Sequence, residues 1–110
     1  MFDLIAHIRR QQIFSKKTFG PYTRPGRAAG VIDHIAKELC EVRDNPADLS
    51  EWIDIIILAL DGAGTQGYTP EQIAAALEAK QTKNEGRVWP DWRTVKPGIA
   101  IEHDRSNDNG

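Results

Sequence analysis

Two pairs of acidic residues are the part of this sequence whose types and spacing could do chemistry. Glu38 and Glu41 form the first pair, and Glu51 and Asp54 form the second. Residues three apart lie on one face of a helix, so each pair would present its two carboxylates together. Carboxylates repel one another unless water or cations offset the repulsion, and carboxylate oxygens are the ligands that Mg²⁺ and Mn²⁺ prefer. The spacing therefore predicts either a solvated acidic face or a site for divalent cations.

Two helices must position these pairs. We expect the first over about residues 29–43, ending at "DNP" because the residue before Pro46 disfavours the α region. The second should begin near residues 46–48, where Asp48 and Glu51 resemble a capping box, and run to about residue 63. Its run "WIDIIILAL" is apolar around nearly the whole circumference and must be covered on several sides. We therefore expect a homo-oligomer, a dimer or a tetramer.

A reversal between the two helices makes them antiparallel neighbours and brings the acidic pairs together. Counting outward from it, Glu41 falls opposite Glu51, and Glu38 falls opposite Asp54. Asp61 lies two turns beyond Asp54 on the same face, as an outer ligand or as a residue facing water near the helix end. Four or five carboxylates would then converge in one cleft.

The remaining elements complete an all-α fold. Residues 3–15 carry apolar groups at helical spacing, and a Gly- and Pro-rich loop follows them. A last helix begins after Thr69, which suits an N-cap, with Gln72 placed to close the capping box. We expect a four- to five-helix bundle in one domain over residues 1–93, followed by an irregular tail over residues 94–110.

Composition limits the function classes. The net charge of −2 and the pI near 5.9 argue against a general binder of nucleic acid polymers, which would usually be basic. The single cysteine, Cys40, excludes an internal disulfide and indicates a reducing compartment. The apolar run "IDIIILAL" is too short to span a membrane and contains Asp54. We expect a cytoplasmic protein of a bacterium or of a phage-infected cell, with no membrane partner.

Several blocks of the sequence resemble a known enzyme superfamily. "GVIDHIAKELCEV" and "DLSEWIDIIILALDGA" resemble the ExxE…ExxD signature of the MazG-like all-α nucleoside triphosphate pyrophosphohydrolases. With "RRQQIFSKKTFGP" and "ALEAKQTKNEGRVWPDW", they look like the dATP/dGTP diphosphohydrolase branch, found in phages and bacteria. The resemblance covers roughly residues 5–93.

This resemblance implies a reaction and a metal site. Such enzymes cleave dGTP or dATP between the α- and β-phosphates, giving a nucleoside monophosphate and pyrophosphate. Mg²⁺, with Mn²⁺ as a substitute, would be held by Glu38, Glu41, Glu51 and Asp54. A carboxylate not saturated by metal could take the proton of the attacking water, and Glu38 and Glu41 are the two candidates for this catalytic role.

The resemblance also implies contacts to the phosphates. Lys80 and Asn84 match the family's phosphate-binding Lys-then-Asn pattern, and Arg87 belongs to the same block. The alternative for these cations is a simple interaction with the carboxyl end of the helix dipole.

Base recognition is expected from amide and aromatic side chains. Gln12 or Gln11 can pair with a base edge because an amide both donates and accepts. Phe14, Phe19 and Trp89 are either stacking partners of the base or core residues. His34 lacks a partner at metal-ligand spacing and is expected at the surface or in a structural role. Two other functions stay open: the same chemistry on dUTP or dCTP, and a non-catalytic helical oligomer that binds nucleotide or cations.

Overall fold

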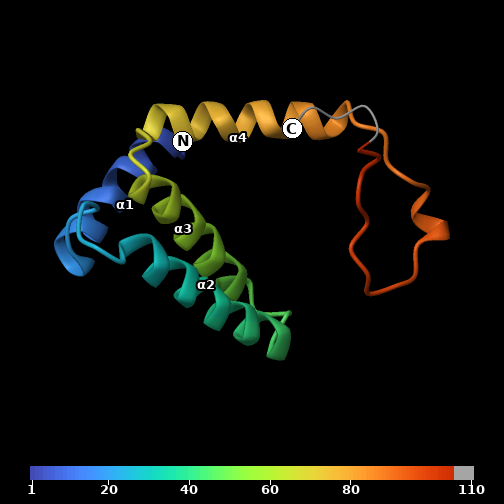
Figure 1. Cartoon of the computed structure of the whole chain (residues 1–110), viewed down its shortest axis with the longest axis horizontal. Helices are drawn as coiled ribbons and strands as arrows, with labels where there is room; N and C mark the ends of the chain where they lie inside the picture. Colours follow the sequence, from blue (N-terminus) through green and yellow to red (C-terminus); the bar gives the residue numbers. More distant parts are fainter. Residues whose placement is uncertain (106–110) are drawn as a thin grey trace. The chain divides into compact units, whose positions relative to one another are not determined.

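The computed structural model describes residues 1–105, and within them the fold consists of helices without strands. The elements are α1 (Leu4–Phe19), α2 (Arg27–Asp44), α3 (Leu49–Thr65), α4 (Pro70–Glu85) and the 3₁₀ turn η1 (Trp92–Thr94) (Figure 1). The predicted all-α fold is confirmed.

The chain divides into two compact units, Met1–Ala75 and Ala76–Gly110. The division falls inside α4, whereas the sequence suggested a boundary at residue 93, which stays a prediction. The tail predicted over residues 94–110 is irregular beyond η1 as far as residue 105, and its last five residues lie outside the described part of the chain.

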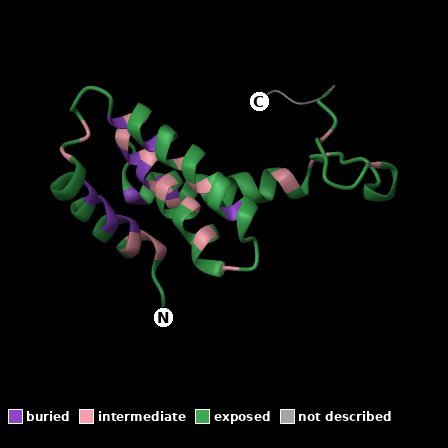
Figure 2. Cartoon of the chain, turned by 90° about the horizontal axis from the view of Figure 1, so that it is seen from below, coloured by how far each residue is buried: buried purple, intermediate pink, exposed green. Residues whose placement is uncertain are grey.

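The first unit is organised around α3, which packs against both α2 and α1. Figure 1 shows α2 and α3 side by side, running in opposite directions from the turn at residues 45–48. This is the antiparallel arrangement that the sequence predicts. Among residues 1–105 the buried hydrophobic side chains are few, namely Ile8, Val31, Val42 and Ile73. Exposed residues cover most of the ribbon (Figure 2).

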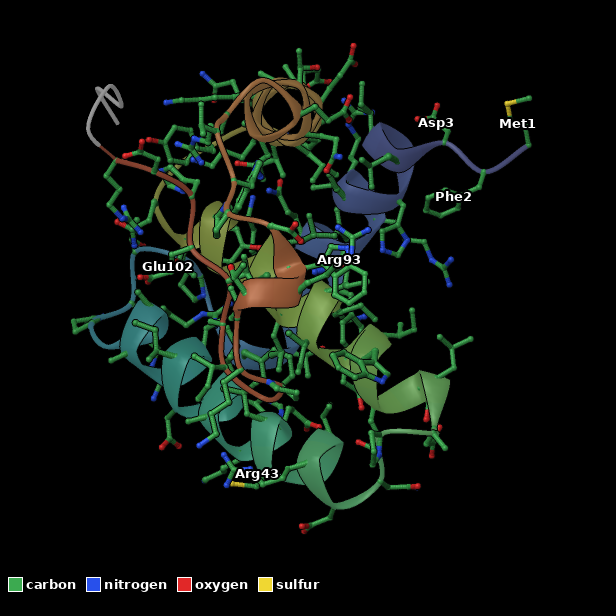
Figure 3. The ribbon with its side chains drawn as sticks, turned by 90° about the vertical axis from the view of Figure 1, so that its right-hand side faces the viewer. Met1, Phe2, Asp3, Arg43, Arg93 and Glu102 are labelled. Carbon is green, nitrogen blue, oxygen red and sulfur yellow. The ribbon has the colours of Figure 1, made fainter. Side chains whose placement is uncertain are left out.

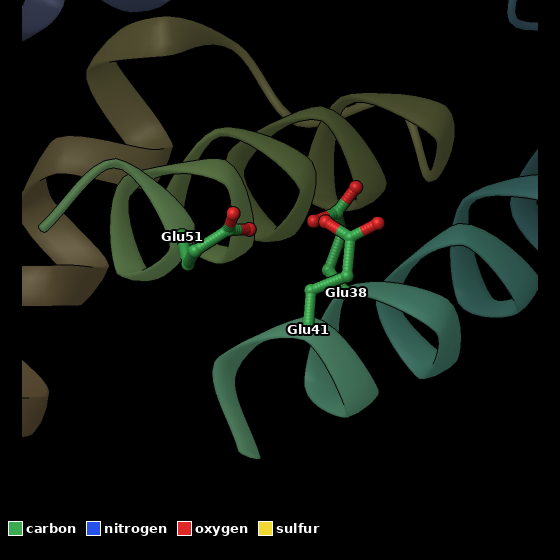
Figure 4. A group of neighbouring side chains, drawn as sticks. All are labelled: Glu38, Glu41 and Glu51. Carbon is green, nitrogen blue, oxygen red and sulfur yellow. The ribbon is translucent and has the colours of Figure 1, made fainter. Parts of the chain in front are cut away.

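Side-chain caps fix where several helices begin. Thr69 and Gln72 form the predicted capping box, since the Gln72 amide oxygen accepts from the Thr69 N–H at 2.9 Å and the Thr69 hydroxyl accepts from the Gln72 N–H at 3.1 Å. The box predicted between Asp48 and Glu51 is wrong. Asp48 instead caps α3 by accepting from the Ser50 N–H at 2.9 Å, and Glu51 extends toward the other glutamates (Figure 4).

The end of α1 lies four residues beyond its predicted position at Ser15. Lys16 and Lys17 occupy its last turn, where cations interact favourably with the helix dipole. The helix stops at Gly20, whose φ of 98° is accessible to glycine without strain. The longer helix places Phe19 close to the beginning of α2, where the Arg27 guanidinium lies 6.0 Å from the centroid of its ring.

A large apolar surface of the first unit is exposed. On α3 the exposed fractions are 49% for Trp52, 53% for Ile56 and 37% for Ile57, and on α2 they are 67% for Ile32 and 50% for Leu39. Met1 and Phe2, which precede α1 in Figure 3, are exposed as well. The expected covering of α3 on several sides is therefore not provided within this unit.

The second unit folds back on itself around Trp89. Its indole N–H donates to the Asn84 carbonyl at 2.7 Å, and its ring meets the His103 ring edge-on with centroids 5.4 Å apart. The Asp104 N–H donates to the Val88 carbonyl at 2.8 Å. Over the described residues, no helix is both long and apolar enough to cross a membrane.

Candidate functional site

Three of the four predicted metal ligands converge between α2 and α3. Glu38 and Glu41 come from α2, and Glu51 comes from the first turn of α3. Each contributes one carboxylate oxygen to a group whose members all lie within 4.8 Å of one another (Figure 4). We call these three residues the glutamate cluster.

The glutamate cluster is electrostatically unfavourable without a cation. Hydrogen bonding with the Glu41 side chain, followed by desolvation and the charge of Glu41, raises the pKa of both Glu38 and Glu51. Oε2 of Glu38 and Oε2 of Glu51 are buried and have no hydrogen-bond partner among the described residues. Buried polar atoms normally have partners. These orphaned oxygens and the all-carboxylate donor set suit a hard divalent cation.

Asp54, the fourth predicted ligand, lies outside this group of oxygens and is exposed. Its negative charge is nevertheless one of the influences that raise the pKa of Glu38. Asp54 therefore stands beside the glutamate cluster, and its role as a ligand stays a prediction.

His34 connects the glutamate cluster to its surroundings. Its Nε2 lies 3.2 Å from Oε1 of Glu38, one helical turn further along α2. The expected surface or structural role of His34 does not include this contact. The signal was present in the spacing of four residues between His34 and Glu38, which places them on one helix face.

A cavity of about 650 Å³ adjoins His34 in the same unit. It is lined by the end of α1, the α1–α2 loop, the first turns of α2 and one face of α3. Its lining includes the aromatic and charged or titratable side chains of Phe19, Arg24, Arg27, His34 and Asp61. Its volume falls in the range of roughly 300–1,000 Å³ that small-molecule sites occupy. Since His34 both lines the cavity and contacts Glu38, the cavity and the glutamate cluster are adjacent.

Asp61 sits at the wall of this cavity in a buried polar network. Its side chain accepts from the Ser15 hydroxyl at 2.7 Å and from the Tyr22 phenol at 2.5 Å. The guanidinium of Arg27 lies 3.8 Å from Oδ2, and both charged side chains are less than a tenth exposed. Asp61 is therefore buried, and the sequence interpretation that it faces water is wrong. It also lies outside the glutamate cluster.

The partners of Asp61 were not anticipated from sequence. Arg27 donates to the Ser15 hydroxyl at 2.9 Å and to the Gly20 carbonyl at 3.1 Å, which ties α1 to the start of α2. Burial, together with the hydrogen bond to Asp61, raises the pKa of the Tyr22 phenol, so Tyr22 acts as a neutral donor. A Cβ on Gly64 would lie 2.9 Å from the Tyr22 hydroxyl, so this close approach requires glycine.

The predicted base-binding residues of the first unit occupy different places. Phe19 lines the cavity, and Phe14 meets its ring edge-on with centroids 6.2 Å apart. Phe14 is 60% exposed and Phe19 is 49% exposed, so the core interpretation of these two rings is wrong. Gln12 is buried away from the cavity lining, and its amide donates to the Tyr68 carbonyl at 3.4 Å.

The predicted phosphate-binding residues lie in the second unit, where two of them contact each other. Arg87 donates to the Asn84 side-chain oxygen at 2.7 Å, and the indole of Trp89 reaches the Asn84 carbonyl. Trp89 is 42% exposed, so it is not a core residue. Lys80 is exposed one turn before Asn84 on α4. That these four residues join the glutamate cluster in one site stays a prediction.

Comparison with known proteins adds one finding. A family model described as dATP/dGTP pyrophosphohydrolase matches residues 7–108. The match spans the glutamate cluster, the cavity and the helix that carries Lys80 and Asn84. No curated protein and no solved structure matches the chain.

Proposed function

This chain belongs to the dATP/dGTP pyrophosphohydrolase family, and on that premise we propose that it hydrolyses dGTP or dATP to the nucleoside monophosphate and pyrophosphate with the help of a divalent cation. The family makes it an enzyme that acts as a nucleoside triphosphate diphosphatase. The observation that carries the metal dependence is the glutamate cluster, in which two buried oxygens have no partner in the described part of the chain.

Glu38, Glu41 and Glu51 would hold Mg²⁺ or Mn²⁺, with Asp54 beside them as the fourth ligand. When bound there, the cation supplies positive charge that offsets both the carboxylates and the triphosphate. Glu41 is exposed, so the glutamate cluster is open to solvent on the side where Glu41 lies.

The chain's own residues position the substrate and move the proton. Glu38 and Glu41 are the two candidates for accepting the proton of the attacking water, because a carboxylate of the cluster that the metal does not saturate can act as a general base. The contact with His34 restricts the orientation of Glu38.

The phosphate chain and the base would use different parts of the protein. Lys80, Asn84 and Arg87 are proposed to contact phosphate oxygens, which matches the donors and charge that phosphates require. The cavity beside His34 is proposed to receive the base, with Phe19 at its wall. The Phe14 ring packs edge-on against Phe19. The roles predicted for Gln12 and Trp89 in base recognition stay predictions, since neither residue lines the cavity.

The exposed apolar surface on α2 and α3 supports a homodimer or a homotetramer. Large exposed apolar patches often mark an interface with another protein. Light scattering after size-exclusion chromatography should give a dimer or tetramer mass, and Ile56→Glu should shift it toward the monomer. A monomeric mass for the unaltered protein would contradict the proposal.

Product analysis tests the proposed reaction. The purified protein is incubated with dGTP, dATP, dUTP and dCTP, with Mg²⁺ or with a chelator, and the products are separated by ion-exchange chromatography. Metal-dependent formation of dGMP or dAMP with pyrophosphate supports the proposal. Preferred turnover of dUTP or dCTP would retain the chemistry and change the substrate. Release of a diphosphate and inorganic phosphate would overturn the site of cleavage. No turnover of any nucleotide would leave a non-catalytic role in binding nucleotide or cations.

A further inference from the structure

The buried carboxylate of Asp61 is a polar group in the cavity wall that the proposed reaction does not use. The residue is 5% exposed, yet it lines the cavity together with Phe19 and Arg24. We propose that Asp61 reads the Watson–Crick edge of the purine and makes guanine the preferred base, an inference that rests on the proposed function.

The position of Asp61 suits the base end of a nucleotide. Asp61 follows Asp54 by seven residues on α3, which corresponds to about 10 Å along the helix axis. A nucleoside 5′-phosphate can bridge such a separation with its phosphate beside the glutamate cluster and its base toward Asp61. His34 stands between the two ends, since it lines the cavity and contacts Glu38.

The hydrogen-bond state of Asp61 leaves capacity for a ligand. Oδ2 accepts from the Ser15 hydroxyl, and Oδ1 accepts from the Tyr22 phenol. An ionised carboxylate has about four lone-pair sites, so each oxygen can accept one hydrogen bond more. The two existing bonds and the nearby Arg27 guanidinium hold the carboxylate in a fixed orientation at the cavity wall.

Guanine and adenine differ in what they offer to such a carboxylate. The Watson–Crick edge of guanine carries two adjacent donors, N1–H and the N2 amino group, which match the two oxygens of one carboxylate. The corresponding edge of adenine carries the acceptor N1, whose lone pair would face the negative charge. A site built to accept hydrogen bonds rejects an analogue that lacks the donors, because its buried acceptors are then left unpaired.

The rest of the cavity suits a flat purine. The Phe19 ring is half exposed at its wall and can stack on a base. Arg24 lines the same cavity and can lie over the base as a planar cation. Stacking on either side chain does not distinguish guanine from adenine, whereas the Asp61 carboxylate can.

A substrate series on the unaltered protein is the first test. The ratio kcat/KM is measured for dGTP, for dITP, which lacks the N2 amino group, and for dATP. We expect the order dGTP, dITP, dATP, with each lost hydrogen bond to the carboxylate reducing kcat/KM by about 10- to 100-fold. Equal values for dGTP and dITP, or a value for dATP equal to or above that for dGTP, would overturn the assignment.

The variant Asp61→Asn separates base reading from a purely structural role. It replaces one acceptor by an amide donor that faces the N2 amino group. We expect kcat/KM for dGTP to fall by about 10- to 100-fold while that for dATP changes only a few-fold. A structural role predicts an equal loss for both substrates, and that outcome would contradict the proposal. Asp33→Asn, the same change at an exposed position of α2, is the control and should leave the dGTP/dATP ratio unchanged.

Binding of the monophosphates keeps this inference separate from the proposed reaction. Calorimetric titration of dGMP and dAMP into the protein in the presence of Mg²⁺ needs no turnover, because a monophosphate has no bond between α- and β-phosphates to cleave. If no triphosphate is hydrolysed but dGMP binds at least tenfold more tightly than dAMP, the proposed function fails and the role of Asp61 stands. If turnover is confirmed but dAMP binds as well as dGMP, the role of Asp61 is refuted. The same two measurements decide the matter if Asp61→Asn does not fold.

Discussion

The helix α3 carries carboxylates in two contrasting environments. Near its start, Glu51 meets Glu38 and Glu41 in a group of like charges, with buried oxygens that lack partners within residues 1–105. Ten residues further along, Asp61 accepts two hydrogen bonds and faces a buried guanidinium. The same chemical group is thus left unsatisfied at one place and fully supported at the other.

This difference indicates what each region is for. An arrangement of mutually repelling carboxylates lowers the stability of the fold unless something else binds there, so the glutamate cluster is best explained by a cation that arrives from solution. The supported carboxylate accepts from Ser15 of α1 and Tyr22 of the α1–α2 loop, so it joins these segments to α3 and keeps one orientation. The first region is suited to a cation, and the second holds one carboxylate in a fixed orientation, as hydrogen bonding to a base edge requires.

The largest expected effect comes from Glu38→Gln. The amide keeps the size of the side chain but cannot accept a proton from water, and it is a weaker ligand for a hard cation. We expect kcat to fall by about 10²- to 10⁴-fold. The measurement is pyrophosphate release under saturating dGTP and Mg²⁺.

Circular dichroism checks that Glu38→Gln remains folded, and Asp33→Asn on the same helix serves as the matched control. Because the change removes one repelling charge, the metal-free variant should be at least as stable as the unaltered protein. Full activity in a folded Glu38→Gln protein would remove the glutamate cluster from the reaction.

A second substitution addresses the supported region. Arg27→Met leaves the buried Asp61 without its cation, and we expect the free energy of unfolding to fall by about 3–5 kcal/mol. Lys37→Met breaks the exposed ion pair with Asp33 and should cost less than about 1 kcal/mol. Urea denaturation compares the two variants. Similar losses would show that the Asp61 network does not differ from a surface ion pair.

Metal binding should act on the first region alone. At a free Mg²⁺ concentration 100 times the dissociation constant, binding raises the free energy of unfolding by about 2.7 kcal/mol. Glu51→Gln should lose most of this increase, whereas Asp33→Asn should keep it. Thermal unfolding with and without Mg²⁺ measures this increase in each protein. An equal increase in all three proteins would place the cation elsewhere.

The sequence predicted the elements that depend on local signals. The capping box at Thr69, the antiparallel pairing across Pro46 and the approach of Glu38, Glu41 and Glu51 all follow from spacing and turn chemistry. The end of α1 lies beyond its predicted position at Ser15. The two lysines after Ser15 resemble the basic loop that follows, but cations also favour the last turn of a helix, where Lys16 and Lys17 lie.

The Asp61 network could not be predicted because its members are far apart in the sequence. Ser15, Tyr22 and Arg27 reach Asp61 only after α1 and α2 have packed against α3. Each of these residues has an ordinary surface interpretation when taken alone. Tertiary packing decides such contacts, and one sequence without distances does not contain that information.

The smallest expected effect is the pH dependence of the metal-free protein. The pKa of Glu38 and that of Glu51 are raised above the ordinary value of 4.5, chiefly by the hydrogen bond with Glu41. Between 4.5 and the raised values, the folded protein holds protons that the unfolded chain has released. Stability should therefore fall as the pH rises through this window, and recover as the pH is lowered.

Urea denaturation in a chelator, at pH steps from 4.5 toward neutrality, measures this slope. Glu41→Gln should flatten it, because the amide donates to the neighbouring carboxylates and stabilises their charged forms. The Asp61 network is the same in both proteins, so the difference between the two slopes reports on the glutamate cluster alone. Identical slopes would mean that the like charges are already relieved by water, and the contrast between the two regions would lose its electrostatic basis.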